Sequence, residues 1–110
     1  MAFSAGDVVL VPFPYRDRLA KRARPAVVVS AAAYNRLGDV VLAAVTSHLP
    51  RFGMDLALAD WAAAGLKTPS TVRMLLATVA ASRVLLQVGH LTERDWMEVQ
   101  ARLHTVFEWP

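Results

Sequence analysis

Residues 25–30, which read PAVVVS, decide the fold because they form an apolar, β-branched run of strand length that begins with proline. Such residues favour strands, and proline is tolerated at the first position of a strand. A similar run, DVVLVPF at residues 7–13, precedes this stretch, and VVLAAVTS at residues 40–47 follows it. The first half of the chain therefore predicts three short strands in succession.

The middle of the chain predicts further short elements. Strand candidates lie at residues 54–58, 70–74 and 83–88, while alanines obscure the type of the stretch between the last two. Residues 60–65 predict one or two helical turns, capped by Asp60 and ended by Gly65.

The C-terminal region predicts the clearest helix. Thr92 is its N-cap and Asp95 lies three residues further on, while Leu91 is placed to pack against Trp96 as a hydrophobic staple. An apolar stripe with helical spacing follows, formed by Trp96, Val99, Leu103, Val106 and Phe107. Strands followed by one terminal helix indicate an α+β fold, a curled antiparallel sheet or small barrel closed by a C-terminal amphipathic helix.

The length and composition limit what kind of protein this is. The 110 residues predict a single domain over residues 1–110, and 55% apolar residues are sufficient for one core. The absence of cysteine excludes disulfides and thiolate chemistry, and it favours a cytoplasmic protein. There is no signal-like N-terminus and no apolar run of roughly 18 residues, so we expect no membrane span.

Positive charge is concentrated in one segment. Residues 14–24 carry five basic side chains against one acid, whereas the whole chain has a net charge of only +3. The five are Arg16, Arg18, Lys21, Arg22 and Arg24. A solvated loop without a partner and an anion-binding loop both fit this pattern, and RNA is an anion that such a segment attracts.

Several side chains in this part of the chain suit phosphodiester chemistry. A phosphate group is best held by an arginine and by hydroxyl donors, which Arg24 and the pair Thr46-Ser47 would supply. His48 follows this pair directly and is placed either near a reacting group or in a plain loop. The three histidines lack metal-ligand spacing, and phosphate-loop, dinucleotide and zinc-protease motifs are absent.

The ordered motifs resemble the MazF/PemK family of toxin ribonucleases over nearly the whole chain. They begin with GDVVLV at residues 6–11 and continue with RPAVVVS at 24–30, Asn35 and VTS at 45–47. The second half contributes TPSTVR at 68–73 and GHLT at 89–92. One departure is the sequence Met74-Leu75-Leu76-Ala77, where the family commonly has an acidic residue and an amide.

The resemblance implies an SH3-like small barrel with a C-terminal helix that forms a homodimer and binds single-stranded RNA. It also implies that Arg24 and Thr46 cleave the RNA without metal or cofactor, leaving 2′,3′-cyclic phosphate and 5′-OH ends. The chain would then be the toxin of a type II toxin-antitoxin pair, a sequence-selective and ribosome-independent endoribonuclease inhibited by an acidic antitoxin. Arginine suits charge stabilisation better than proton abstraction, so the general base is left unassigned.

Further RNA contacts are expected around the two catalytic candidates. The residues are Arg16, Arg18, Lys21, Arg22, Ser47, His48, Ser70 and Arg73. Two other functions stay open: a toxin of the same fold that binds a DNA topoisomerase, and a non-catalytic barrel that binds RNA or protein. The first would not need Arg24 with Thr46, and the second would fit a loss of function at residues 74–76.

Overall fold

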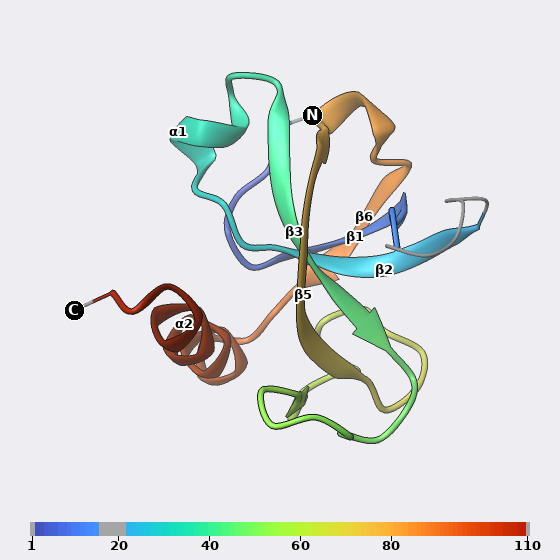
Figure 1. Cartoon of the computed structure of the whole chain (residues 1–110). Coiled ribbons are helices and arrows are strands. Elements are labelled where there is room, and N and C mark those ends of the chain that lie inside the picture. The colour runs from blue at the N-terminus through green and yellow to red at the C-terminus, as the bar shows by residue number, and fades with distance from the viewer. Residues whose placement is uncertain (1, 16–21, 110) are drawn as a thin grey trace.

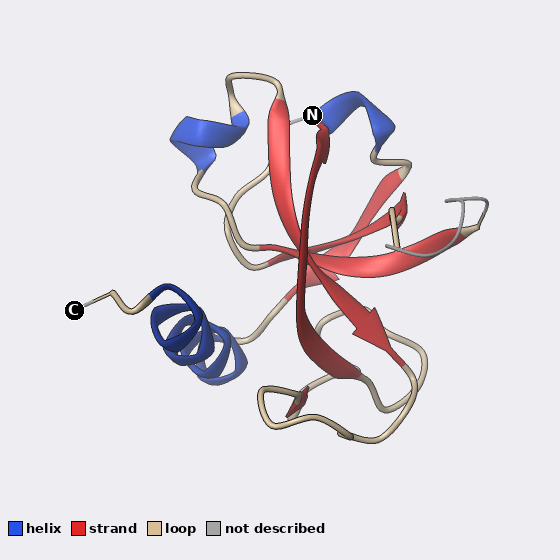
Figure 2. Cartoon of the chain, in the orientation of Figure 1, coloured by secondary structure: helices blue, strands red, loops and turns tan. Residues whose placement is uncertain are grey.

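A computed structural model of the chain describes residues 2–15 and 22–109, and these contain one six-stranded antiparallel sheet (Figures 1 and 2). The strands are β1 (Asp7–Pro12), β2 (Ala23–Val28), β3 (Asp39–Thr46), β4 (Leu56–Ala57), β5 (Thr71–Ala80) and β6 (Leu86–His90). Their order across the sheet is β4-β5-β3-β2-β1-β6. The helical elements are α1 (Ala32–Asn35), the 3-10 turn η1 (Ala81–Arg83) and α2 (Glu93–Phe107). The sheet curls into a half-barrel, which confirms the predicted α+β class.

Several element boundaries differ from those predicted. The alanine-rich stretch continues β5 for ten residues, because β5 pairs with β3 from Thr71 to Ala80. β6 begins at Leu86 rather than at residue 83, and β4 spans only two residues of the expected 54–58. Residues 60–65 form turns instead of a regular helix, although Gly65 ends them in a positive-φ conformation as expected. Helix α1 was not predicted.

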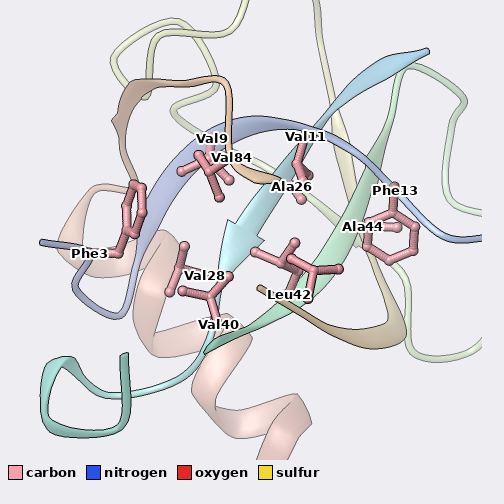
Figure 3. Packing of buried hydrophobic residues seen from close by; sticks show 11 residues of the cluster. Phe3, Val9, Val11, Phe13, Ala26, Val28, Val40, Leu42, Ala44 and Val84 are labelled. Carbon is pink, nitrogen blue, oxygen red and sulfur yellow. The ribbon is translucent and has the colours of Figure 1, made fainter. Parts of the chain in front are cut away.

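The first core cluster fills one face of the curled sheet. Figure 3 shows that it runs from Phe3 at one end to Phe13 at the other. Alternating residues of the central strands supply its middle, because successive side chains of a strand point to opposite faces. These residues are Val9, Val11, Ala26, Val28, Val40, Leu42 and Ala44.

The second core cluster joins the opposite face of the sheet to helix α2. Val99 and Leu103 of α2 are buried there, with Trp96 packed against the cluster. Val106 and Phe107 were expected to continue this stripe, but they are 42% and 47% exposed. The stripe prediction is therefore wrong for the last turn of α2. Within residues 2–15 and 22–109, no helix is both long and apolar enough to cross a membrane.

The unusual sequence at residues 74–77 contributes to both clusters. Met74 and Leu76 pack against the second cluster, and Leu75 and Ala77 pack against the first. These four side chains of β5 therefore alternate between two apolar environments, which accounts for their apolar character.

Asn35 connects three parts of the chain through its buried side chain. Its Nδ2 donates to the carbonyl oxygens of Phe3 at 2.9 Å and Ser30 at 3.0 Å. Its Oδ1 accepts from the hydroxyl of Ser30, whose Oγ in turn accepts from the backbone N–H of Val41 at 2.9 Å. Asn35 therefore fixes the N-terminal segment and the start of β3 to the end of β2.

Replacing Asn35 with alanine should lower the free energy of unfolding by about 1–3 kcal/mol, because it leaves buried polar groups without partners. Urea unfolding of the variant measures this loss. Gln100→Ala is the matched control, since Gln100 is an exposed amide on α2. Equal stability of the two variants would contradict the role given to Asn35.

Candidate active site

Three neighbouring strands bring polar side chains to one end of the sheet. Ala26 of β2 pairs with Ala44 of β3 at the end of their ladder, and Arg24 and Thr46 lie two residues beyond this pair on their strands, toward the same end of the sheet. Both point to the face of the first core cluster, because they alternate in step with Ala26 and Ala44. Arg73 of β5 lies on the same face, two residues before Leu75. The strands thus place two arginines and a hydroxyl beyond the end of the apolar core.

These side chains line a pocket of about 540 Å³. Its other polar side chains are Tyr15, Ser47, His48, Arg51, Lys67, Thr68 and Ser70. Four of the lining residues carry a positive charge at neutral pH, and no described lining residue is an aspartate or a glutamate. The pocket therefore suits an anionic ligand, and its arginines can bind a phosphate in a bidentate manner.

Arg24 and Thr46 have polar groups available to a ligand. Arg24 is half-buried, and its guanidinium has no hydrogen-bond or ion-pair partner among the described residues. Thr46 Oγ1 accepts from the backbone N–H of His48 at 3.2 Å. The Thr46 hydroxyl hydrogen has no acceptor within the described part of the chain, so it can donate to an oxygen of a bound anion.

Arg73 is held by the loop between β3 and β4. Its guanidinium carbon lies 4.7 Å from the ring centre of Phe52, and its Nε lies 3.7 Å from Oδ1 of Asp55. Asp55 also accepts the backbone N–H groups of Arg51 at 2.9 Å and Phe52 at 3.1 Å. This carboxylate, which is only 4% exposed, therefore shapes the loop and positions Arg73 in the pocket.

The structure brings some of the predicted site residues together in the pocket and leaves others outside it. Ser47, His48, Ser70 and Arg73 line the pocket with Arg24 and Thr46. The Ser70 side chain is buried and its hydroxyl donates to the carbonyl of Thr68 at 2.8 Å, which limits its availability to a ligand. Arg22 is exposed and does not line the pocket. Arg16, Arg18 and Lys21 fall outside the described residues.

The sequence patterns do not predict two basic residues of the pocket, Arg51 and Lys67. Both come from loops, and neither belongs to a basic cluster or a regular pattern in the sequence. Only the tertiary fold of the loops at residues 47–55 and 58–70 places them beside Arg24.

The other two histidines lie away from the pocket lining. His90 Nδ1 is 2.7 Å from Oδ1 of the buried Asp7, and His104 makes an edge-on ring contact with Trp109. Within residues 2–15 and 22–109, no group of three or more His, Cys, Asp or Glu side chains is placed to hold a metal ion.

Helix α2 holds the loop that forms one wall of the pocket. Asp95 Oδ1 and Oδ2 accept the backbone N–H groups of Ala59 at 3.0 Å and Asp60 at 2.8 Å. Asp60 in turn accepts from Thr92 and makes two hydrogen bonds with Arg94. Asp60 was expected to cap a helical turn, and Asp95 to accompany the Thr92 N-cap three residues on; both carboxylates instead connect this loop to α2. The Arg94 and Thr92 hydrogen bonds lower the pKa of Asp60 from 3.8 to about 2.

This shift predicts an acid dependence of stability. The pKa of Asp60 is lower in the folded state than in the unfolded state. The Asp60 carboxylate therefore adds to the free energy of unfolding above pH 3.8, and this contribution is lost as the pH falls towards about 2. The stability difference between wild type and Asp60→Asn should therefore shrink across this range in urea unfolding experiments. Asp39→Asn, which removes an exposed carboxylate, is the control. A difference independent of pH would contradict the role of the Asp60 carboxylate.

Comparison with known proteins identifies a matching family model and similar folds. The model described as "PemK-like, MazF-like toxin of type II toxin-antitoxin system" matches residues 4–107. A comparison with curated protein sequences finds no match.

The similar solved structures include an endoribonuclease in complex with its cognate antitoxin from Mycobacterial species. It is 22% identical with a TM-score of 0.78, over 99% of this chain and 96% of that chain. MazE-MazF from Deinococcus radiodurans is 23% identical with a TM-score of 0.75, over 97% and 96% of the respective chains. A MazF toxin from Mycobacterium tuberculosis is 17% identical with a TM-score of 0.74, over 94% and 98%. These similarities establish the fold.

Proposed function

The chain belongs to the family of PemK-like, MazF-like toxins of type II toxin-antitoxin systems, and on this premise we propose that it is an endoribonuclease that cleaves single-stranded RNA. The observation that carries the proposal is the pocket in which Arg24 and Thr46 meet with three further basic residues. This set of groups suits a phosphodiester and the extra negative charge that develops on it during cleavage.

The proposed reaction uses the RNA as its own nucleophile. The 2′-oxygen attacks the adjacent phosphorus, the bond from phosphorus to the 5′-oxygen breaks, and the products are a 2′,3′-cyclic phosphate and a 5′-OH. Arg24 stabilises the negative charge of the phosphorane with its guanidinium. Thr46 donates its hydroxyl hydrogen to a non-bridging oxygen of the same phosphate. These steps need neither a metal nor a cofactor.

RNA binding is proposed to extend beyond the scissile phosphate. Arg51, Lys67 and Arg73 line the pocket and would contact neighbouring phosphates, and Ser47 would make polar contacts. Ser70 would contribute less, because its buried hydroxyl already donates to Thr68. The basic segment adds Arg16, Arg18, Lys21 and Arg22 to the attraction of the RNA. The cleavage is proposed to be sequence-selective, independent of the ribosome and cytoplasmic.

The proposed partners are a second copy of the chain and an acidic antitoxin. An acidic, partly disordered segment would complement the positive pocket and exclude RNA from it. A second copy could cover some of the exposed apolar surface, which includes Leu85, Leu86, Met97, Phe107 and Trp109. Sedimentation of the purified protein tests the homodimer, and monomers at all concentrations would contradict it.

The test of the proposed function is cleavage of a mixed-sequence single-stranded RNA by the purified protein in EDTA. We expect discrete cuts with and without added Mg²⁺, and intact DNA of the same sequence, because DNA lacks the attacking 2′-OH. Sequencing of the new ends measures the selectivity. RNA that stays intact while the protein binds it would contradict the enzyme and favour a binding module.

A further inference from the structure

We infer that His48 is the general base that takes the proton from the attacking 2′-OH, an assignment that rests on the proposed ribonuclease function. The described pocket lining includes no aspartate or glutamate. Arginine, lysine and tyrosine side chains ordinarily stay protonated at neutral pH, and serine and threonine are weak bases. Histidine is the residue type that exchanges a proton in this pH range, and His48 is the one histidine in this lining.

The backbone of His48 is fixed on both sides, next to Thr46. Its N–H donates to Oγ1 of Thr46 at 3.2 Å, and its carbonyl oxygen accepts from the hydroxyl of Thr71 at 2.7 Å. Thr71 is buried and pairs with Thr46 across β3 and β5, which makes this anchor part of the sheet. The fold therefore holds the residue bearing the imidazole beside the hydroxyl that is proposed to bind the phosphate.

The imidazole itself is free to accept a proton. His48 is exposed, and its ring nitrogens have no hydrogen-bond partner within the described residues. The charged and titratable groups of the described pocket lining, besides His48 itself, are Arg24 from β2, Arg51 from the same loop, Lys67 from the following loop, Arg73 from β5 and Tyr15 after β1. Asp55 also belongs to the loop of His48, but it is outside the lining and its carboxylate is engaged by Arg73 and by two backbone N–H groups. Each of the four cations can remain bound to phosphate while His48 exchanges the proton.

The proposed step moves one proton from the RNA to His48. A neutral ring nitrogen of His48 removes the proton of the 2′-OH while the 2′-oxygen forms its bond to phosphorus. The bond from phosphorus to the 5′-oxygen breaks, and the departing oxygen takes a proton from water. Arg24 keeps its proton throughout, because a guanidinium does not lose its proton at neutral pH.

Single-turnover cleavage by His48→Gln tests this assignment, because glutamine keeps a polar side chain but cannot act as a base. The rate should fall by about 100-fold or more at neutral pH, with little change in KM. In wild type the rate should rise with pH through the range in which histidine loses its proton, and this rise should vanish in the variant. His104→Gln is the matched control, because His104 lies on α2 outside the pocket lining, and it should cleave like wild type.

A second substrate distinguishes a general base from the other roles that His48 could have. An RNA with sulfur in place of the scissile 5′-oxygen has a leaving group that needs no protonation. A base acts on the 2′-OH, so His48→Gln should be impaired on this substrate as on ordinary RNA. Full recovery on the sulfur substrate would overturn the assignment in favour of an acid, and a raised KM with an unchanged pH profile would overturn it in favour of simple binding.

These outcomes are distinct from failure of the ribonuclease proposal. Wild-type cleavage that depends on Arg24 but is insensitive to His48→Gln would overturn only the base assignment. Asp17, an acid of the basic segment, is the rival base, and loss of the pH-dependent rise in Asp17→Asn instead of His48→Gln would also overturn it. Absence of any wild-type cleavage would overturn both proposals together.

Discussion

Replacing Arg24 with alanine is expected to lower the single-turnover rate of RNA cleavage by about 100- to 1,000-fold, the usual effect of removing a group that stabilises transition-state charge. Arg24 lines the same pocket as Thr46, and its guanidinium has no partner within residues 2–15 and 22–109. The loss should appear mainly in the cleavage step. RNA binding should weaken much less, because three other basic residues of the pocket stay in place.

Two variants make this result specific. Arg24→Lys keeps the charge but loses the bidentate geometry, so it should recover only part of the rate. Arg36→Ala removes an exposed arginine outside the pocket lining and should cleave like wild type. If Arg24→Ala remained folded and cleaved RNA at the wild-type rate, the catalytic role of Arg24 would be wrong.

A large loss of stability is expected for Gly89→Ala in β6. A Cβ atom at residue 89 would lie 2.1 Å from the carbonyl oxygen of Ala64 and 2.6 Å from its carbonyl carbon. Backbone atoms cannot move aside as a side chain can, so the loop and β6 must separate. We expect the free energy of unfolding to fall by about 1–3 kcal/mol or more. For a chain of this size each 1 kcal/mol lowers Tm by roughly 4–8 °C, which thermal unfolding can measure.

Gly53→Ala is the control for this variant. Residue 53 lies in the loop before β4, where an added Cβ would meet no atom within 4 Å. Its stability should stay close to that of wild type. Equal unfolding temperatures for Gly89→Ala and Gly53→Ala would contradict the close packing of residues 64 and 65 against β6.

The fold was predictable where local pattern and tertiary environment agree. The β-branched runs became β1, β2 and β3, and Thr92 became the N-cap position of α2. Prediction failed where pairing decided the outcome, as in β5, whose alanines have low strand propensity but are held by β3. The structural roles of Asp60 and Asp95 were also not predictable, because their bonds join residues about 35 positions apart.

The candidate site was predictable in part for a similar reason. Arg24 and Thr46 lie at strand ends, and the family resemblance identified them, whereas the antiparallel pairing of β2 with β3 explains why both reach the same end of the sheet. Arg51 and Lys67 enter the pocket from loops whose paths depend on long-range contacts. His48 follows Thr46 in the sequence, but its role as a base depends on which other groups line the pocket, and only the tertiary structure shows these.

The most direct test of cleavage by 2′-OH attack uses an RNA with a single 2′-deoxy nucleotide immediately before a mapped cleavage site. The reaction is run in EDTA beside the unmodified RNA. We expect that the unmodified RNA yields a 2′,3′-cyclic phosphate and a 5′-OH, and that the modified RNA is not cut at that site. Cleavage of the modified RNA at that site at an undiminished rate would contradict attack by the 2′-OH.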